Sequence, residues 1–320
     1  MLRANLTFLV LVVFSSSVSG KHIYIVDGIN SKKTILFIEE LRNQIWSAEI
    51  SQIAISDTIS TDPSASVIVA IGPASLTKVL ESTHFPTIPV LAVFTSKTSY
   101  NEITSRYIKY KHSVSSIFAD SSLNDQLALI TGIYNKKLTI GIILSESTKY
   151  VEDELETLKA DYNVDFHLEF IDDLSEVGSA LASLKRKGIN SLLAVPDSNI
   201  YTSHSLKHLL MSTYRGGQTI VGFSENIVRS GALASVYYLP NHIAIDCSDT
   251  IKSYFNLGRL KKPSHSNNFN VAVNRTIARS MNLYKNDPNE LVERVKKNIS
   301  FQDKAFKFVF IDLEISDSYL

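Results

Sequence analysis

The chain repeats one pattern of strand, polar turn, helix and strand, and this repeat constrains the fold more than any other feature. The first copy runs from VIVAIGPAS (67–75) to PVLAVFTS (89–96), and the second from LLAVPDSNIY (192–201) to TIVGFSEN (219–226). Strands that alternate with helices are typical of parallel sheets, which bury both of their faces. We therefore expect an α/β protein of two Rossmann-like lobes with parallel sheets, whose binding edges face a shared cleft.

Composition allows this size and narrows the range of partners. The chain has 320 residues, 44% of them hydrophobic, which is enough for one large domain or two ordinary ones. Its formal net charge is zero, so nucleic acid is not an expected partner. The single cysteine, Cys247, cannot form an intramolecular disulfide, and we expect it to be a small buried hydrophobic side chain. His204 and His208 lack a third ligand, so a solvated helix face is preferred and no metal or other cofactor is expected.

The first twenty residues have the features of a secretory signal peptide. Arg3 supplies the positive start, residues 6–14 form an apolar run too short to span a bilayer, and Val18 and Gly20 are small. The alternative is a membrane anchor, but no stop-transfer flank follows the run. We expect cleavage after Gly20 and a soluble, monomeric protein in the periplasm.

The remaining patterns divide the chain between the lobes. A strand, HIYIVDG (22–28), opens an N-terminal lobe over residues 21–120, to which about 239–262 return. The pattern restarts at LTIGIILSES (138–147) in a C-terminal lobe over 121–238, joined by about 263–283. Residues 284–320 are expected to form a C-terminal helix and a tail, in which the alternating FKFVFID has no evident partner.

Several of these stretches carry a family resemblance through their order. IVAIGPASLTKVL and IPVLAVFTS are followed by TIGIILSES, VPDSNIY, VGFSENIVRSGALASVYY and NFNVAVNRTIARSMNL. Over about residues 22–283 the set resembles the periplasmic substrate-binding proteins of the ABC-transporter type, in the family that includes tryptophan/tyrosine-binding members. It looks most like a short proteobacterial branch, with which we also associate the periplasmic component of a bacterial sterol-lipid transport system. The resemblance implies a type I periplasmic binding protein-like fold whose lobes, joined by crossover segments, close on a ligand without catalysis.

If the lobes face one another, ligand contacts come from the turns that follow the strands. The amides that open the helix at Ser75 suit a carboxylate or another anion, and tyrosines near the cleft suit an organic ligand. The alternative is that the serines and aspartates cap helices and form turns, and that the tyrosines pack between the lobes. The expected ligand-binding residues are Asp27, Gly72, Pro73, Ala74, Ser75, Thr95, Ser96, Ser145, Glu146, Asp197, Tyr201, Ser224, Glu225, Tyr237 and Tyr238.

Motifs for catalysis are missing from the sequence. GFSEN (222–226) lacks the second glycine of a nucleophile elbow, and neither a Walker A loop nor a dinucleotide fingerprint is present. We therefore expect no enzyme, but an exported solute-binding protein that delivers a small organic ligand to the permease of a membrane transporter. A carrier of an apolar lipid such as a sterol, and a sensor module read by a partner protein, stay open as alternatives. The first lobe is shorter after its first strand than in the amino-acid binders, so the ligand's identity is not carried over.

Overall fold

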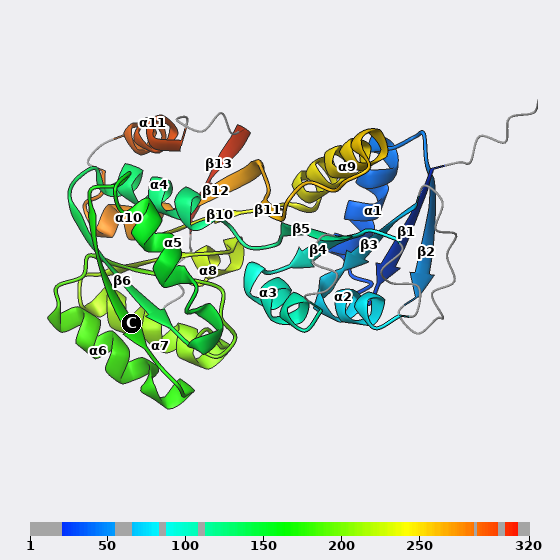
Figure 1. Ribbon diagram of the computed structural model, residues 1–320. Helices are drawn as coiled ribbons and strands as arrows, with labels where there is room; N and C mark the ends of the chain where they lie inside the picture. Colours follow the sequence, from blue (N-terminus) through cyan, green and yellow to red (C-terminus); the bar gives the residue numbers. More distant parts are fainter. Residues whose placement is uncertain are drawn as a thin grey trace, which may run out of the picture.

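The chain folds into two lobes, each built on its own β-sheet (Figure 1). This computed structural model describes residues 21–54, 66–82, 88–107, 113–284, 287–299 and 305–312. The α/β architecture with two parallel-dominant sheets is the one expected from the repeat. The expected signal peptide, residues 1–20, lies outside the described residues.

The first lobe contains a six-stranded parallel sheet in the order β11-β5-β4-β3-β1-β2. All six residues of β3 are buried, because helices cover both faces of the sheet. Helices α1 and α9 pack together on one face, and α2 and α3 cover the other. The strands are β1 (His22–Asp27), β2 (Glu49–Ala54), β3 (Ser66–Ile71), β4 (Val90–Thr95), β5 (Val114–Phe118) and β11 (Ser264–His265), and the helices are α1 (Lys32–Gln44), α2 (Gly72–Leu80), α3 (Lys97–Ser105) and α9 (Pro240–Leu257).

The second lobe contains a seven-stranded sheet in the order β13-β12-β10-β9-β8-β6-β7. Its strands are parallel except where β12 pairs antiparallel with β10, and β13 then continues parallel to β12. The strands are β6 (Leu138–Leu144), β7 (Val164–Phe170), β8 (Ser191–Leu193), β9 (Thr219–Gly222), β10 (Ala234–Tyr237), β12 (Asn268–Asn274) and β13 (Ala305–Ile311).

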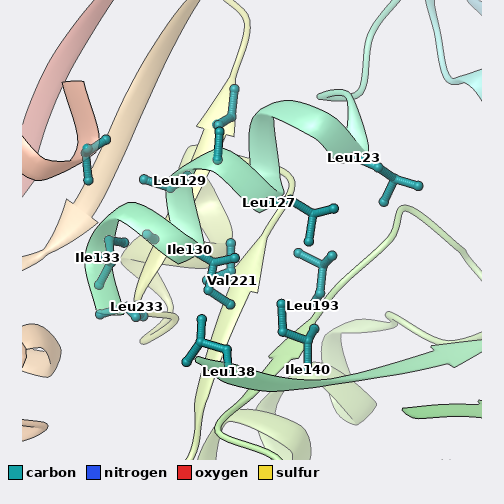
Figure 2. Packing of buried hydrophobic residues seen from close by; sticks show 14 of the residues in the cluster. Leu123, Leu127, Leu129, Ile130, Ile133, Leu138, Ile140, Leu193, Val221 and Leu233 are labelled. Atoms are coloured by element: carbon teal, nitrogen blue, oxygen red, sulfur yellow. The ribbon is translucent and has the colours of Figure 1, made fainter. Parts of the chain in front are cut away.

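Helices also cover both faces of the second sheet. Figure 2 shows α4 over one face, where Leu127 and Ile130 belong to the same buried cluster as Leu193 and Val221 of the strands. A separate cluster fills the other face beneath α6 and α7. The helices are α4 (Leu123–Tyr134), α5 (Val151–Leu158), α6 (Val177–Arg186), α7 (Ser203–Arg215), α8 (Glu225–Arg229), α10 (Arg275–Ser280) and α11 (Pro288–Ile299), with short 3-10 turns η2 (Glu146–Thr148) and η3 (Leu174–Glu176).

The C-terminal segment, for which the sequence offered no partner, is part of the second lobe. Helix α11 lies so close to α4 that a Cβ on Gly132 would come within 2.9 Å of the Val295 Cα. The strand β13 pairs along β12 over its whole length, and the rings of Phe269 and Phe306 stack with centroids 5.5 Å apart. The alternation in FKFVFID is therefore that of an added edge strand.

The chain passes between the two sheets three times within the described residues: after β5, after β10 and after β11. Because β11 pairs with β5, the third passage follows His265. Tyr238, on the second passage, packs against the cores of both lobes. Three connections of this kind therefore join the two lobes.

The only tryptophan of the chain, Trp46, lies just beyond the end of α1 at Gln44, and its side chain is 89% exposed. Across the described ranges, the helices are all too short or too polar to cross a membrane.

Candidate functional site

The predicted residues of the first lobe follow three adjacent strands, β1, β3 and β4, so they share the carboxyl edge of the sheet. The Gly28 N–H donates to Ser75 Oγ at 2.9 Å, and Ser75 is fully buried. Asp27 Oδ1 accepts from the amides of Ile29 and Asn30 at 2.8 and 3.1 Å. Asp27 and Ser75 therefore hold the turn after β1 in place.

The start of α2 is the open part of this edge. Gly72 has φ +83°, a backbone conformation that favours glycine, and a Cβ there would also displace the end of the Ile29 side chain, whose Cδ1 would be 2.7 Å away. Pro73 and Ala74 are exposed, and no side chain caps the helix. No side-chain cap therefore competes with a ligand for the first amides of α2, to which Pro73 contributes no N–H.

Thr95, the last residue of β4, and Ser96, which follows it, are engaged in local hydrogen bonds. Thr95 is fully buried and its hydroxyl donates to the Val93 carbonyl at 3.4 Å. Ser96 caps α3, since its Oγ accepts from the Ser99 amide at 3.1 Å. Both side chains therefore have the capping and turn roles that were the alternative to ligand contact.

The second lobe brings Ser145 and Asp197 together. Asp197 Oδ2 accepts hydrogen bonds from Ser145 Oγ at 2.6 Å, Thr148 Oγ1 at 2.9 Å and Ser147 Oγ at 3.3 Å. Its Oδ1 accepts from the Asn199 amide at 2.8 Å. These bonds join the turn after β6 to the turn after β8. Glu146, which lies in the turn after β6, is exposed.

Tyr201 and Glu225 lie further along this edge. The ring of Tyr201 meets Phe223 edge to face with centroids 5.8 Å apart, and burial raises the pKa of the Tyr201 hydroxyl above its usual value. Ser224 caps α8 by accepting from the Ile227 amide at 3.4 Å. Glu225 accepts from Arg229 Nε at 2.9 Å. The strand order β9-β8-β6 places the turns that carry these residues side by side.

Tyr237 and Tyr238 are more enclosed than cleft platforms. Tyr237 is 8% exposed, and its hydroxyl accepts from Asn270 Nδ2 at 3.4 Å. Burial raises the pKa of the Tyr238 hydroxyl well above its usual value, as expected for a ring between two cores. Packing between lobes, the alternative considered from sequence, describes the surroundings of Tyr238.

A contact between the lobes, which we name the interlobe bridge, consists of Lys97, Thr98, Tyr150 and Glu154. Lys97 Nζ donates to Glu154 Oε2 and lies 5.1 Å from the centroid of the Tyr150 ring. Thr98 Oγ1 and the Tyr150 hydroxyl are 3.1 Å apart. Lys97 and Thr98 continue the polar run after Ser96, and this run could have identified them as residues of the interlobe edge. Tyr150 and Glu154 lie in an ordinary amphipathic segment, which gives no such indication.

A small cavity of about 10 Å³ lies beside the bridge and is lined by both lobes. Its size is that of about one water molecule. Asp120 in its wall accepts from the Lys97 amide at 2.7 Å, and burial raises the pKa of this carboxyl to about 6. Gln126 Nε2 donates to Ser121 Oγ at 2.8 Å, whereas its buried Oε1 has no partner among the described residues. The interlobe space therefore contains polar groups that the sequence did not indicate.

In the part of the chain that the structure describes, no cluster of three or more His, Cys, Asp or Glu residues suits a metal ion. His204 and His208 are exposed on α7. Cys247 is fully buried in the core of the first lobe, as expected, and burial raises the pKa of its thiol.

Sequence comparisons identify no relative of the chain. No family model matches it, and no curated protein matches it.

Solved structures match it over nearly their whole length. The ligand-free, open structure of a substrate binding protein with adhesive properties from Clostridium difficile is 16% identical, with a TM-score of 0.62 over 91% of this chain and 99% of that one. An ABC domain in complex with L-Trp from Streptococcus pneumonia is 13% identical, with a TM-score of 0.54 over 91% of this chain and 100% of that one.

A conserved domain protein from Vibrio cholerae is 14% identical, with a TM-score of 0.53 over 86% of this chain and 98% of that one. At these identities the similarity concerns the fold, and two of the three proteins are named for binding or carry a bound small molecule. The chain has the two-lobed α/β fold of type I periplasmic binding proteins.

Proposed function

We propose that this protein is a substrate-binding protein that captures a small organic ligand between its lobes and delivers it to a membrane transporter. The observation that carries the proposal is that polar turns follow the carboxyl ends of the strands in both sheets. Residues that follow β4 in one lobe and β6 in the other contact each other between the lobes. In open α/β sheets, ligands bind outside the carboxyl ends of the strands. The interlobe bridge connects the two lobes beside these edges.

The similar structures support the same function. One is named a substrate binding protein, and another was determined with L-Trp. We extend small-ligand binding to this chain as part of the proposal, but not the tryptophan itself. The proposal also includes action in the periplasm as a monomer, after removal of residues 1–20, without catalysis, cofactor or nucleic acid.

Exposure divides the expected contact residues into two groups. Ser75, Thr95 and Asp197 are buried and already hydrogen-bonded, so we assign them to the support of the turns. Ligand contact is assigned to the exposed start of α2 at Pro73 and Ala74, together with five residues that retain some solvent exposure: Asp27, Glu146, Tyr201, Ser224 and Glu225. Ser96 and Tyr238 are also partly exposed, but Ser96 caps α3 and Tyr238 packs between the cores of the lobes.

The experiment is native mass spectrometry of the exported protein, followed by extraction of what it carries and calorimetric titration with the compound found. A tryptophan at Ala74 should block the cleft and abolish binding, because Ala74 is exposed at the uncapped start of α2. The matched control is Ala182→Trp, which introduces the same side chain at an exposed position of α6.

Each outcome bears on a different part of the proposal. A small polar or aromatic solute, bound by the control variant and not by Ala74→Trp, supports the function and the site. A sterol or another lipid in the extract supports a lipid carrier instead. Equal binding by both variants refutes the cleft as the site. A protein that never carries or binds a small molecule supports the sensor alternative.

A further inference from the structure

A second cavity lies within the second lobe, at the edge of its sheet opposite to the interlobe cleft. Its lining includes Lys136, Asn190 and Gly217, which stand just before the strands β6, β8 and β9. The carboxyl ends of these strands lead instead to the interlobe turns. The cavity has a volume of about 370 Å³. This volume lies within the range of about 300–1,000 Å³ that is usual for small-molecule pockets.

The charged groups of this cavity are cationic. Lys136 and Arg294 line it, and none of the lining residues that the structure describes is acidic. In the described part of the chain, neither cation forms an ion pair with a carboxylate. Two cations without a counter-ion at one cavity favour the binding of an anion.

Arg294 is held at the wall, and only one of its side-chain nitrogens, Nη2, has a partner among the residues that the structure describes. Its Nη2 donates to the Leu283 carbonyl at 2.5 Å, and its buried Nε has no partner among the described residues. A guanidinium has five N–H donors, so the remaining groups can form paired hydrogen bonds with an oxyanion. Asn190 and Asn282, which also line the cavity, add amide groups.

The cavity also has an apolar wall, formed by the Tyr134 ring with Met281 and Leu283. The Tyr134 hydroxyl is within 2.8 Å of Thr219 Oγ1, and it donates to the Asn190 carbonyl at 3.2 Å. These bonds fix the plane of the ring, and Lys136 Nζ lies 5.8 Å from its centroid. The Tyr134 ring can stack on a planar apolar part of a ligand, and the Lys136 ammonium beside it can attract a negative group of the same ligand.

The C-terminal helix completes this cavity. Asn298 Nδ2 of α11 donates to Thr131 Oγ1 of α4 at 3.1 Å, and the close approach at Gly132 prevents α11 from shifting toward α4. Arg294 lies on the same helix, one turn before Asn298. The segment outside the two repeated units therefore positions the cavity's guanidinium.

We propose that this cavity, which we name the anion pocket, binds a small organic oxyanion that carries a ring, independently of the interlobe cleft. A carboxylate or a phosphate would lie between Arg294 and Lys136, with the ring against Tyr134.

The test is a titration of the mature protein with phenyl phosphate at low ionic strength, followed by ¹H–¹⁵N correlation spectra. We expect saturable shifts of the amides of Gly217, Asn282 and Leu283, with a Kd below about 1 mM. Benzyl alcohol, which has a ring and no charge, should leave these amides unchanged.

Variants show whether the two cations are responsible. Lys136→Gln and Arg294→Gln should each weaken phenyl phosphate binding by about tenfold, as expected for the loss of one charge-assisted contact. Lys136 is exposed, so its variant keeps the test valid if Arg294→Gln fails to fold. Lys149→Gln removes an exposed cation of the same lobe on the cleft side and should bind normally.

Three results would overturn the proposal. They are the absence of saturable shifts, shifts confined to the turns of the interlobe edge, and equal weakening by Lys149→Gln and Lys136→Gln. None of these results depends on the ligand of the cleft, so failure here leaves the proposed transport function untouched.

Discussion

Replacing Asp120 by asparagine should stabilise the protein at neutral pH and change little at acidic pH. The Asp120 side chain is 7% exposed on the first passage between the lobes. Desolvation raises the pKa of its carboxyl from 3.8 to about 6, although the Lys97 amide and the Lys97 charge act in the opposite direction. Asparagine keeps an oxygen that can accept from the Lys97 amide and carries no charge.

The direction of the effect follows from proton binding. Between pH 3.8 and about 6 the folded state binds more protons at Asp120 than the unfolded state does, so stability falls as pH rises. The contribution of the protonated Asp120 carboxyl to the stability of the folded protein is fully present below pH 3.8 and is lost above about pH 6. A shift of about two pKa units corresponds to on the order of 3 kcal/mol, which is the upper limit of the gain expected for Asp120→Asn at pH 7.5.

Urea unfolding at pH 4 and pH 7.5, followed by far-ultraviolet circular dichroism, measures this difference. Fluorescence is a poor reporter, because the only tryptophan, Trp46, is 89% exposed in the folded protein. The matched control is Asp153→Asn, an equal loss of charge at an exposed position of α5. If the free energies of unfolding of Asp120→Asn and the parent protein differ equally at both pH values, the burial argument for Asp120 is wrong.

Three further changes test the packing and the bridge. Gly72→Ala should cost about 1–3 kcal/mol, because the residue has φ +83°, and thermal unfolding would measure it; an unchanged Tm would contradict the turn geometry. Alanine at Lys97 and Glu154, singly and together, should give a coupling energy of about 1 kcal/mol or less in a double-mutant cycle. The double variant should also have a larger radius of gyration in solution scattering, and an unchanged radius would show that the bridge does not restrain the lobes. Gly132→Leu should force α11 from α4 and make the C-terminal segment sensitive to limited proteolysis, in contrast to an exposed control such as Gly178→Leu.

Much of the fold follows from local patterns. The run SVIVAI predicts β3 because a strand covered on both faces contains only apolar or small residues, and all six of its residues are buried. The turns after the strands can also be predicted from the sequence, because small and polar residues end each apolar run. Whether those turn residues contact a ligand stays a prediction.

The missed features depend on contacts between distant parts of the chain. Lys97 and Glu154 are 57 residues apart, and the local sequence around each of them does not indicate the other as its partner. Thr131 and Asn298 are separated by 167 residues, so no local pattern could place Arg294 beside a cavity of the second lobe. The burial of Asp120 was equally hidden, because a short polar segment between a strand and a helix normally indicates solvent exposure.

The place of α9 has a consequence for the order in which the chain acquires its structure. This helix supplies Ile243, Cys247 and Ile251 to the core of the first lobe, although it follows the strands β6 to β10 of the second sheet. The first lobe therefore cannot close one face of its hydrophobic core until about residue 257 has been synthesised. The strands β6 to β10 form a more local unit. Because local contacts form faster than distant ones, we expect nucleation in the middle of the chain, with the N-terminal half consolidating later.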